Sequence, residues 1–291
     1  MSELESLLAR AERVLARLEA VLPAPAPATD WDAARAFLWR RRNGRAGLQA
    51  VAMPSAVRLR DLRGIDEQKA RIDRNTRQFL AGRHANNVLL TGARGSGKSS
   101  LVKALLNEYA NKGLRVVEVD KTDLADLPDI MELLAARPER FIVYCDDLSF
   151  EEGEVAYKAL KSALDGSVSG VADNVLIYAT SNRRHLMPEF HDENRPVRHA
   201  DGEIHPGEAV EEKVSLSERF GLWLSFYPFD QDAYLGIAAH WLRVFGVPEA
   251  RAAGARQEAL QWALMRGSRS GRVAWQFARD FAGRADDGEE P

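Results

Sequence analysis

The segment 88–101 most constrains what this chain can fold into, because residues 92–99 spell G-x-x-x-x-G-K-S. Three glycines allow the positive φ angles with which a loop wraps its amide groups around an anion. In this pattern the lysine reaches the outer phosphates of a nucleotide and the following hydroxyl ligates Mg²⁺. The residues expected to contact the nucleotide are Gly92, Ala93, Arg94, Gly95, Ser96, Gly97, Lys98, Ser99 and Ser100.

The neighbouring segments agree with this interpretation. Residues 87–91 form a short apolar run typical of a buried strand, and residues 99–107 have the pattern of an amphipathic helix. The positive N-terminal end of that helix faces the same phosphates. A glycine turn that matches by chance does not explain the order of strand, loop and helix, so the sequence predicts a nucleotide-binding protein.

Beyond this loop, apolar runs alternate with helical patterns, as in a parallel sheet covered by helices. Residues 230–283 are helical in pattern and predict a separate all-helical subdomain. Its expected core side chains are Trp241, Leu242, Phe245, Leu260, Trp262, Leu264, Trp275, Phe277 and Phe281. The expected fold class is α/β, and the further strands are expected at residues 114–119, 140–145, 174–179 and 222–226.

Two acidic residues directly follow the apolar strand expected at 140–145, and the hypothesis of ATP hydrolysis rests on them. Asp146 is expected to hold Mg²⁺ together with Ser99, and Asp147 to polarise the attacking water. The Asp147 side chain is one methylene shorter than the glutamate usual at this place, so hydrolysis is expected to be slow or to recruit Glu151 or Glu152. The alternative is that both acids only cap the next element.

These motifs together resemble the core of the AAA-type P-loop ATPases. The resemblance rests on residues 92–99, on the acidic pair 146–147, on residues 179–182 and on residues 217–223. It implies a parallel sheet core with a C-terminal helical lid, active as a homo-oligomeric ring or chain. By this resemblance the further site residues are Ile65 beside adenine, Asn182 as a water-orienting sensor, Arg219 as a finger acting on a neighbouring subunit, and Arg272 as a lid sensor, with Arg269 as its rival.

Longer phrases are similar to an uncharacterised bacterial branch of these ATPases, catalogued as domain of unknown function 815. The similar phrases lie at residues 85–90, 92–104, 146–152, 179–186, 204–208 and 217–226, within a resemblance that covers roughly residues 35–283. The expected division is an N-terminal helical extension and linker over 1–57, an ATPase core over 58–228 and the helical lid over 229–291.

The first sixty residues carry two further patterns. Residues 4–22 have an apolar stripe at helical period, and a proline–alanine spacer follows at 23–28. The stripe is expected to pack either on its own core or on a neighbouring subunit. A second short helix is expected over 31–38 with Asp30 as its cap. It is followed by the arginines Arg40, Arg41, Arg42 and Arg45, which either pair with local carboxylates or contact a phosphate backbone.

The sequence thus predicts a Mg²⁺-dependent ATP hydrolase that drives assembly or remodelling of an unknown macromolecular partner. The alternative is a nucleotide-dependent binding switch with little or no hydrolysis.

A net charge of −3 gives no overall attraction to nucleic acid, so such a partner stays open but is not favoured. No run is long and apolar enough for a bilayer, and a lone cysteine fits a cytoplasmic protein. Four histidines between His185 and His205 match no known metal-ligand spacing.

Overall fold

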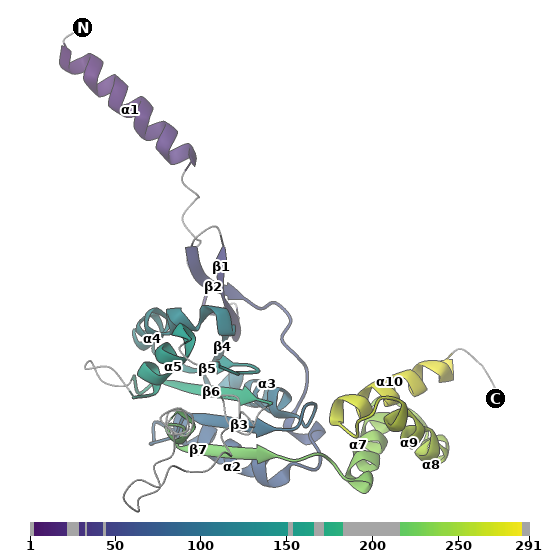
Figure 1. Ribbon diagram of the computed structural model, residues 1–291. Helices are drawn as coiled ribbons and strands as arrows, with labels where there is room; N and C mark the ends of the chain where they lie inside the picture. Colours follow the sequence, from purple (N-terminus) through teal and green to yellow (C-terminus); the bar gives the residue numbers. More distant parts are fainter. Residues whose placement is uncertain are drawn as a thin grey trace, which may run out of the picture.

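The computed structural model describes residues 3–21, 29–32, 34–42, 45–150, 154–165, 172–182 and 216–286. These residues form an N-terminal helix, an α/β core and a C-terminal helical unit, so the expected fold class is confirmed (Figure 1). The histidines at 185–205 and both Glu151 and Glu152 lie outside the described residues.

Seven strands of the described chain form one sheet in the order β2-β1-β4-β5-β6-β3-β7. Neighbours from β1 to β7 pair in parallel, and β2 alone runs antiparallel to its neighbour. The five strands expected from the sequence are therefore present. Their bounds, with the two additional strands first, are Ala36–Arg42 (β1), Arg45–Ala50 (β2), Val88–Gly92 (β3), Leu114–Glu118 (β4), Arg140–Cys145 (β5), Val175–Ser181 (β6) and Leu222–Phe226 (β7).

The expected helix over 31–38 is wrong, because this stretch leads into a β-hairpin. The pattern alternates with period two: Phe37 and Trp39 are buried, whereas Leu38 between them is only partly buried. β1 completes the edge of the sheet by pairing with β4, and Trp39 Nε1 donates a hydrogen bond to Asp126 Oδ2 at 2.9 Å. Burial of two aromatic rings against the sheet outweighs the helix propensity of the alanines nearby.

Helices cover both faces of the sheet. The helices α2 (Asp66–Leu80) and α3 (Lys98–Tyr109) pack on one face, and α4 (Leu127–Ala135) and α5 (Val155–Asp165) pack on the other. Strand side chains alternate between the two layers; Ile142 on β5 joins the α2/α3 layer and Val143 joins the α4/α5 layer. Short 3₁₀ turns complete the core at Leu59–Asp61 (η1), Ala110–Lys112 (η2) and Lys121–Asp126 (η3).

The C-terminal unit, here called the lid, consists of α7 (Gln231–Val244), α8 (Glu249–Gly254), α9 (Arg256–Met265) and α10 (Gly271–Asp286). α7 begins where Asp230 Oδ1 accepts a hydrogen bond from the Ala233 amide at 2.8 Å. Leu242, Phe277 and Phe281 lie in the lid core as expected. Leu264 does not, because its side chain is 82% exposed.

Two arginines of the expected basic cluster pair with carboxylates of the core. Arg40 forms an ion pair with Asp120, and Arg41 Nη2 lies 2.5 Å from Asp126 Oδ1. These pairs tie the hairpin to the turn after β4, which favours a structural role for both side chains. Among the described helices, none combines the length and apolar character that crossing a bilayer requires.

Candidate functional site

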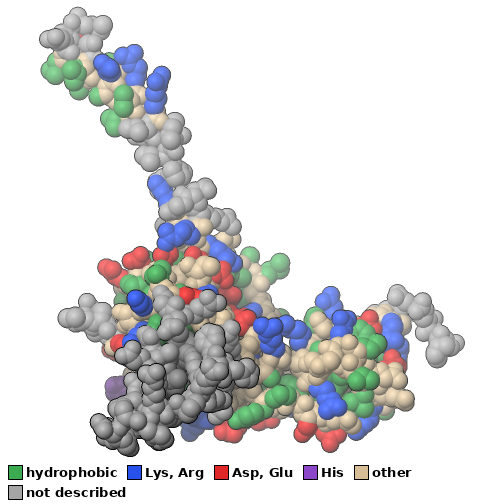
Figure 2. All heavy atoms as spheres, viewed as in Figure 1, with side chains coloured by type: hydrophobic (Ala, Val, Ile, Leu, Met, Phe, Trp, Pro, Cys, Tyr) green, Lys and Arg blue, Asp and Glu red, His purple; other side chains and the backbone are tan. Residues whose placement is uncertain are grey.

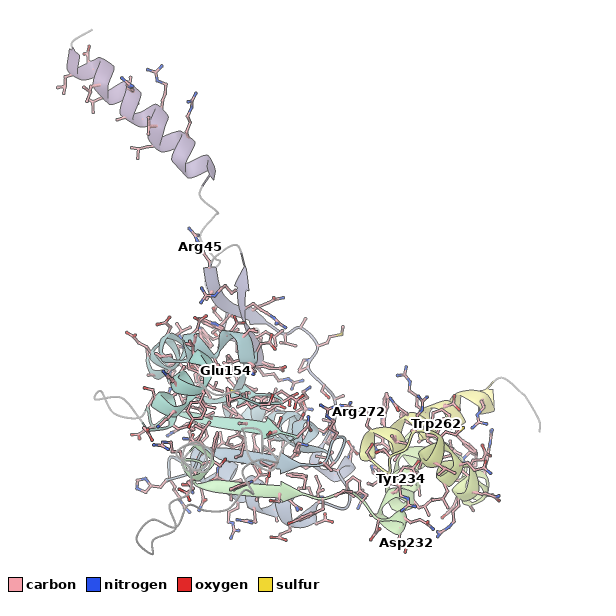
Figure 3. The ribbon with its side chains drawn as sticks, in the orientation of Figure 1. Arg45, Glu154, Asp232, Tyr234, Trp262 and Arg272 are labelled. Atoms are coloured by element: carbon pink, nitrogen blue, oxygen red, sulfur yellow. The ribbon has the colours of Figure 1, made fainter. Side chains whose placement is uncertain are left out.

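A cavity of about 1020 Å³ opens between the carboxyl ends of the strands and the lid. This is the edge of an open α/β sheet at which ligands generally bind. Figure 3 shows Arg272, at the start of α10, where the lid meets the core. The expected site residues that line the cavity are Ile65, Arg94, Gly95, Ser96, Gly97, Lys98, Ser99, Ser100, Asp146, Asp147, Asn182 and Arg272.

The three glycines of the loop have the positive φ angles that the sequence predicts. φ is +121° at Gly92, +73° at Gly95 and +104° at Gly97. A Cβ on Gly92 would lie 1.9 Å from the carbonyl oxygen of Phe226, so no other residue fits there. The loop thus passes close to the end of β7 before α3 begins at Lys98, with its first residues lining the cavity.

Lys98 folds back over the loop that precedes it. Its Nζ donates hydrogen bonds to the carbonyl oxygens of Gly92 at 2.7 Å and Ala93 at 2.8 Å, and to Asn182 Oδ1 at 3.0 Å. Burial lowers the pKa of Lys98, and the carboxylates of Asp147 and Asp146 offset only part of this effect. An anion in the cavity would stabilise the charged amine, so the site is suited to a phosphate group.

Ser99 and Asp146 bring two oxygen ligands together at the floor of the cavity. Ser99 Oγ donates to Asp146 Oδ1 at 2.7 Å, and Thr180 Oγ1 donates to the same oxygen at 2.6 Å. Burial raises the pKa of Asp146, but the hydrogen bonds from Thr180 and Ser99 and the nearby Tyr144 hydroxyl outweigh it and hold the pKa below its ordinary value. A hydroxyl beside an ionised carboxylate is a donor set that fits Mg²⁺.

Asp147 and Asn182 form the next pair along the cavity. Asn182 Nδ2 donates to Asp147 Oδ1 at 2.5 Å, and the Asp147 amide donates to Thr180 Oγ1 at 2.9 Å. Asp147 has φ +51°, the one positive value at a non-glycine residue in the described chain. Aspartate tolerates this left-handed conformation better than glutamate does, which accounts for the shorter acid at this position.

Sequence reasoning missed Thr180 as a site residue. Its hydroxyl joins both acids, since it donates to Asp146 and accepts from the Asp147 amide. The signal was available in the polar run Thr-Ser-Asn that ends an apolar strand, of which only the last member was assigned a role.

The lid closes the other side of the cavity. Arg272 lines it, whereas Arg269 lines a second cavity of about 770 Å³, so the two candidate sensor arginines enter different cavities. Ile65 reaches the loop, because its Cδ1 lies 3.4 Å from the place of a Cβ on Gly97. Two lid aromatics, Trp241 and Trp275, also line the cavity. Both were expected in the lid core: Trp241 packs against that core, whereas Trp275 is partly buried and lies outside it.

Three expected site residues do not line this cavity. Gly92 and Ala93 contribute their carbonyl oxygens to Lys98 instead. Arg219 lies just before β7, where its Nε is 2.5 Å from Asp165 Oδ1, and its side chain is 26% exposed. Within the described residues no group of three or more His, Cys, Asp or Glu side chains could hold a metal ion by itself.

A solved structure shares this architecture. The chain is 14% identical to Aeropyrum pernix ORC1 in complex with DNA, with a TM-score of 0.50 over 79% of this chain and 62% of that one. For a Thermotoga maritima RuvB mutant the identity is 15% and the TM-score 0.49, over 77% of this chain and 64% of that one. The chain thus spans less than two thirds of either relative. Likeness at this identity shows the fold, which is that of the AAA+ P-loop proteins.

A search of curated proteins finds no match. The family described as "Protein of unknown function (DUF815)" matches residues 32–285, which include the hairpin, the core and the lid. The phrases quoted from the sequence fall within that range. The chain therefore belongs to the DUF815 family, whose fold is that of the AAA+ P-loop proteins.

Proposed function

We propose that this protein binds ATP with Mg²⁺ in the cavity between core and lid and hydrolyses it to drive assembly or remodelling of a macromolecular partner. The convergence of Lys98, Ser99, Asp146, Asp147 and Asn182 on one edge of the sheet supports this proposal above all. Phosphoryl transfer needs a cation at the phosphates, a metal ligand set and a group that orients water, and these residues supply all three.

Each residue has a distinct task. Lys98 exchanges its hydrogen bonds to the loop carbonyls for hydrogen bonds to the phosphates. The backbone amides at the start of α3, the positive end of the helix dipole, also stabilise the phosphates. Ser99 and Asp146 would hold Mg²⁺, whose charge neutralises the phosphate oxygens. Asp147 accepts a proton from the attacking water while Asn182 fixes the direction of the carboxylate. Arg272 approaches from the lid and stabilises charge on the outer phosphate.

The adenine end of the nucleotide lies against apolar side chains. Ile65, Trp241 and Trp275 line the same cavity; Ile65 is buried and both tryptophans are partly buried, so together they offer the apolar surface that a base needs. Closure of the lid over the base would thereby depend on nucleotide, as in many enzymes that exclude water in this way.

Arg219 acts on a neighbouring subunit. It is absent from the lining of its own cavity, and it lies near the surface with part of its side chain exposed. An arginine supplied in trans can raise hydrolysis by about 10³-fold or more. Activity should therefore depend on assembly of the protein into a homo-oligomer.

The test is ATP turnover per subunit as a function of protein concentration. Turnover should rise and then level off for the unchanged chain. Lys98→Ala should abolish nucleotide binding, whereas Arg219→Ala should keep binding and lose turnover. Asp165→Asn is the matched control, because it breaks the ion pair of Arg219 but leaves the guanidinium. If Asp165→Asn and Arg219→Ala lose the same activity, the arginine is structural and the trans assignment is wrong.

A nucleotide-dependent binding switch is the second candidate. The Asp147 carboxylate is short and is already held by Asn182 at 2.5 Å, which favours slow hydrolysis. Tight ATP binding with no turnover at any protein concentration would establish this function and exclude the hydrolase. In that case nucleotide should change the affinity for a partner.

The partner is a macromolecule of unknown class. Arg40 and Arg41 are both engaged by core carboxylates, so a nucleic-acid partner is not favoured. Binding to DNA in low salt that is lost when both residues become alanine would reverse this conclusion. A cytoplasmic setting would supply ATP and Mg²⁺ and agrees with the buried thiol of Cys145.

A further inference from the structure

The helix α1 (Glu3–Val21) carries an apolar face that its own core does not cover. Leu4 and Leu7 are each 68% exposed, and Leu8, Val14 and Leu15 are more than half exposed. In Figure 2 the hydrophobic side chains follow one side of α1 and the basic side chains another. A lone helix of this length is marginal in water, so the face must be buried against a partner for the helix to persist.

The described part of the core offers no matching surface. Outside α1, the large exposed apolar side chains of the described chain lie after the hairpin, on α4, on α5, after β7 and in the lid: Met53, Leu133, Val155, Tyr227, Val244, Leu264 and Met265. Only the last two are adjacent, and both lie on the lid helix α9. A stripe about three turns long, from Leu4 to Leu15, requires a continuous apolar groove, which these scattered residues do not form.

The apolar face of α1 repeats with a period of seven. Leu4 and Ala11 are one heptad apart, as are Leu7 and Val14, and Leu8 and Leu15. This is the spacing with which two helices pack side by side over several turns. A partner with the same spacing is therefore preferred over a globular surface.

Charged residues along the two borders of this face favour a second α1 helix as the partner and a parallel orientation of the pair. Arg10 and Arg17 follow one border, and Glu5 and Glu12 follow the other. When two such helices lie parallel, a two-fold axis along them places the arginine border of each against the glutamate border of the other. In an antiparallel pair, arginine would face arginine and glutamate would face glutamate, and like charges at this distance repel.

We propose that α1 packs in parallel against α1 of a second copy of this chain. The helix is thus an assembly element that works without nucleotide, separate from the contact that would bring Arg219 to a neighbouring cavity. The alternating proline–alanine sequence at 23–28 is typical of a spacer. Such a spacer would allow two paired helices to be joined to cores that do not contact each other.

Disulfide trapping tests the pairing and its direction in the full chain. Leu4→Cys should form a covalent dimer under mild oxidation, because a parallel pair places the two cysteines together at one end. An antiparallel pair would place them about 25 Å apart. Ala9→Cys, on the opposite face, is the matched control and should stay monomeric. The native Cys145 is buried and gives little background. Equal trapping at both positions, or none at Leu4→Cys, would overturn the proposal.

Charge exchange provides a second measurement, by sedimentation equilibrium without nucleotide. The double change R10E/R17E makes both borders acidic, and E5R/E12R makes both basic. Each variant alone should associate at least tenfold more weakly than the unchanged chain, and an equal mixture should recover the association. If neither variant changes the mass, α1 pairs with nothing or with its own core, and the proposal fails. Neither change touches the cavity, so this failure leaves the proposed ATPase activity to be judged by turnover.

Discussion

The backbone amide of Gly271, the first residue of α10, donates a hydrogen bond to the carbonyl oxygen of Gly95 at 2.9 Å. This contact joins the lid directly to the phosphate loop. The next residue, Arg272, lines the cavity, so the same bond fixes where the arginine enters it. A change in the loop is therefore transmitted to the lid without an intervening side chain.

Gly95→Ala should weaken nucleotide binding by about tenfold, because it strains the loop and displaces the lid together. Gly95 has φ +73°, and a Cβ there would lie 2.8 Å from Ser270. Fluorescence titration with a labelled nucleotide would measure the loss. Gly236→Ala is the control: this glycine is exposed inside α7 with open space around it, and the change should raise stability by about 0.5–1 kcal/mol. Unchanged affinity in Gly95→Ala would contradict the coupling.

Thr180→Val should lower turnover at least tenfold and cost about 1–3 kcal/mol of stability. The change removes two hydrogen bonds, the one from the Asp147 amide to Thr180 Oγ1 and the one from Thr180 Oγ1 to Asp146. The methyl group keeps the shape of the side chain, so packing is not the cause. Thr180→Ser retains the hydroxyl and should restore most of the turnover. Turnover and chemical denaturation would be measured on the same preparations. A serine variant as poor as valine would show that the hydroxyl is not what matters.

Trp39→Phe should destabilise the protein by about 1–3 kcal/mol, because Asp126 loses the hydrogen bond from the indole while remaining largely buried. Denaturant unfolding gives the difference. Trp262→Phe is a matched control in the lid, since the buried Nε1 of Trp262 has no hydrogen-bond partner in the described structure. That variant should lose clearly less. Equal decreases in the free energy of unfolding would mean that the volume of the ring, not the hydrogen bond, accounts for the stabilisation by Trp39.

Glu118→Gln should stabilise the protein at neutral pH. Burial raises the pKa of Glu118 above its ordinary value, with Lys103 opposing part of the shift. The folded chain therefore binds the proton more tightly than the unfolded chain, and stability falls as pH rises between the unfolded and folded pKa values. Glutamine removes this cost, and a rise in Tm of about 2–4 °C at pH 7 is expected for each kcal/mol recovered. The gain should disappear below pH 4. Glu108→Gln, at an exposed position on α3, is the matched control.

The phosphate loop could be predicted because its requirements are local. The positive φ angles of Gly92, Gly95 and Gly97 follow from the loop itself, and the acids at the end of β5 follow from an apolar strand that stops at Asp146. Parallel strands bring such residues to one edge of a sheet whatever lies between them. The phosphate-binding part of the cavity was therefore within reach of the sequence.

The hairpin could not be predicted, because its cause lies far along the chain. The stretch around Phe37 has ordinary helix formers before it, and only the open edge of β4 and the carboxylate of Asp126 make an extended strand the better state. The position of Leu264 depends likewise on which face of α9 meets the lid core. Contacts of this kind decide between states that are nearly equal locally.

The hairpin also determines where a mechanical force applied to α1 would enter the sheet. The segment that follows α1 enters the sheet at Ala36, the amino end of β1, while the cavity lies at the carboxyl ends of the strands. Tension applied through α1 would reach the sheet at β1, which pairs in parallel with β4 over Ala36↔Val116, Phe37↔Val117 and Leu38↔Glu118. Force from a second copy joined through α1 would thus enter the sheet at the end opposite the cavity.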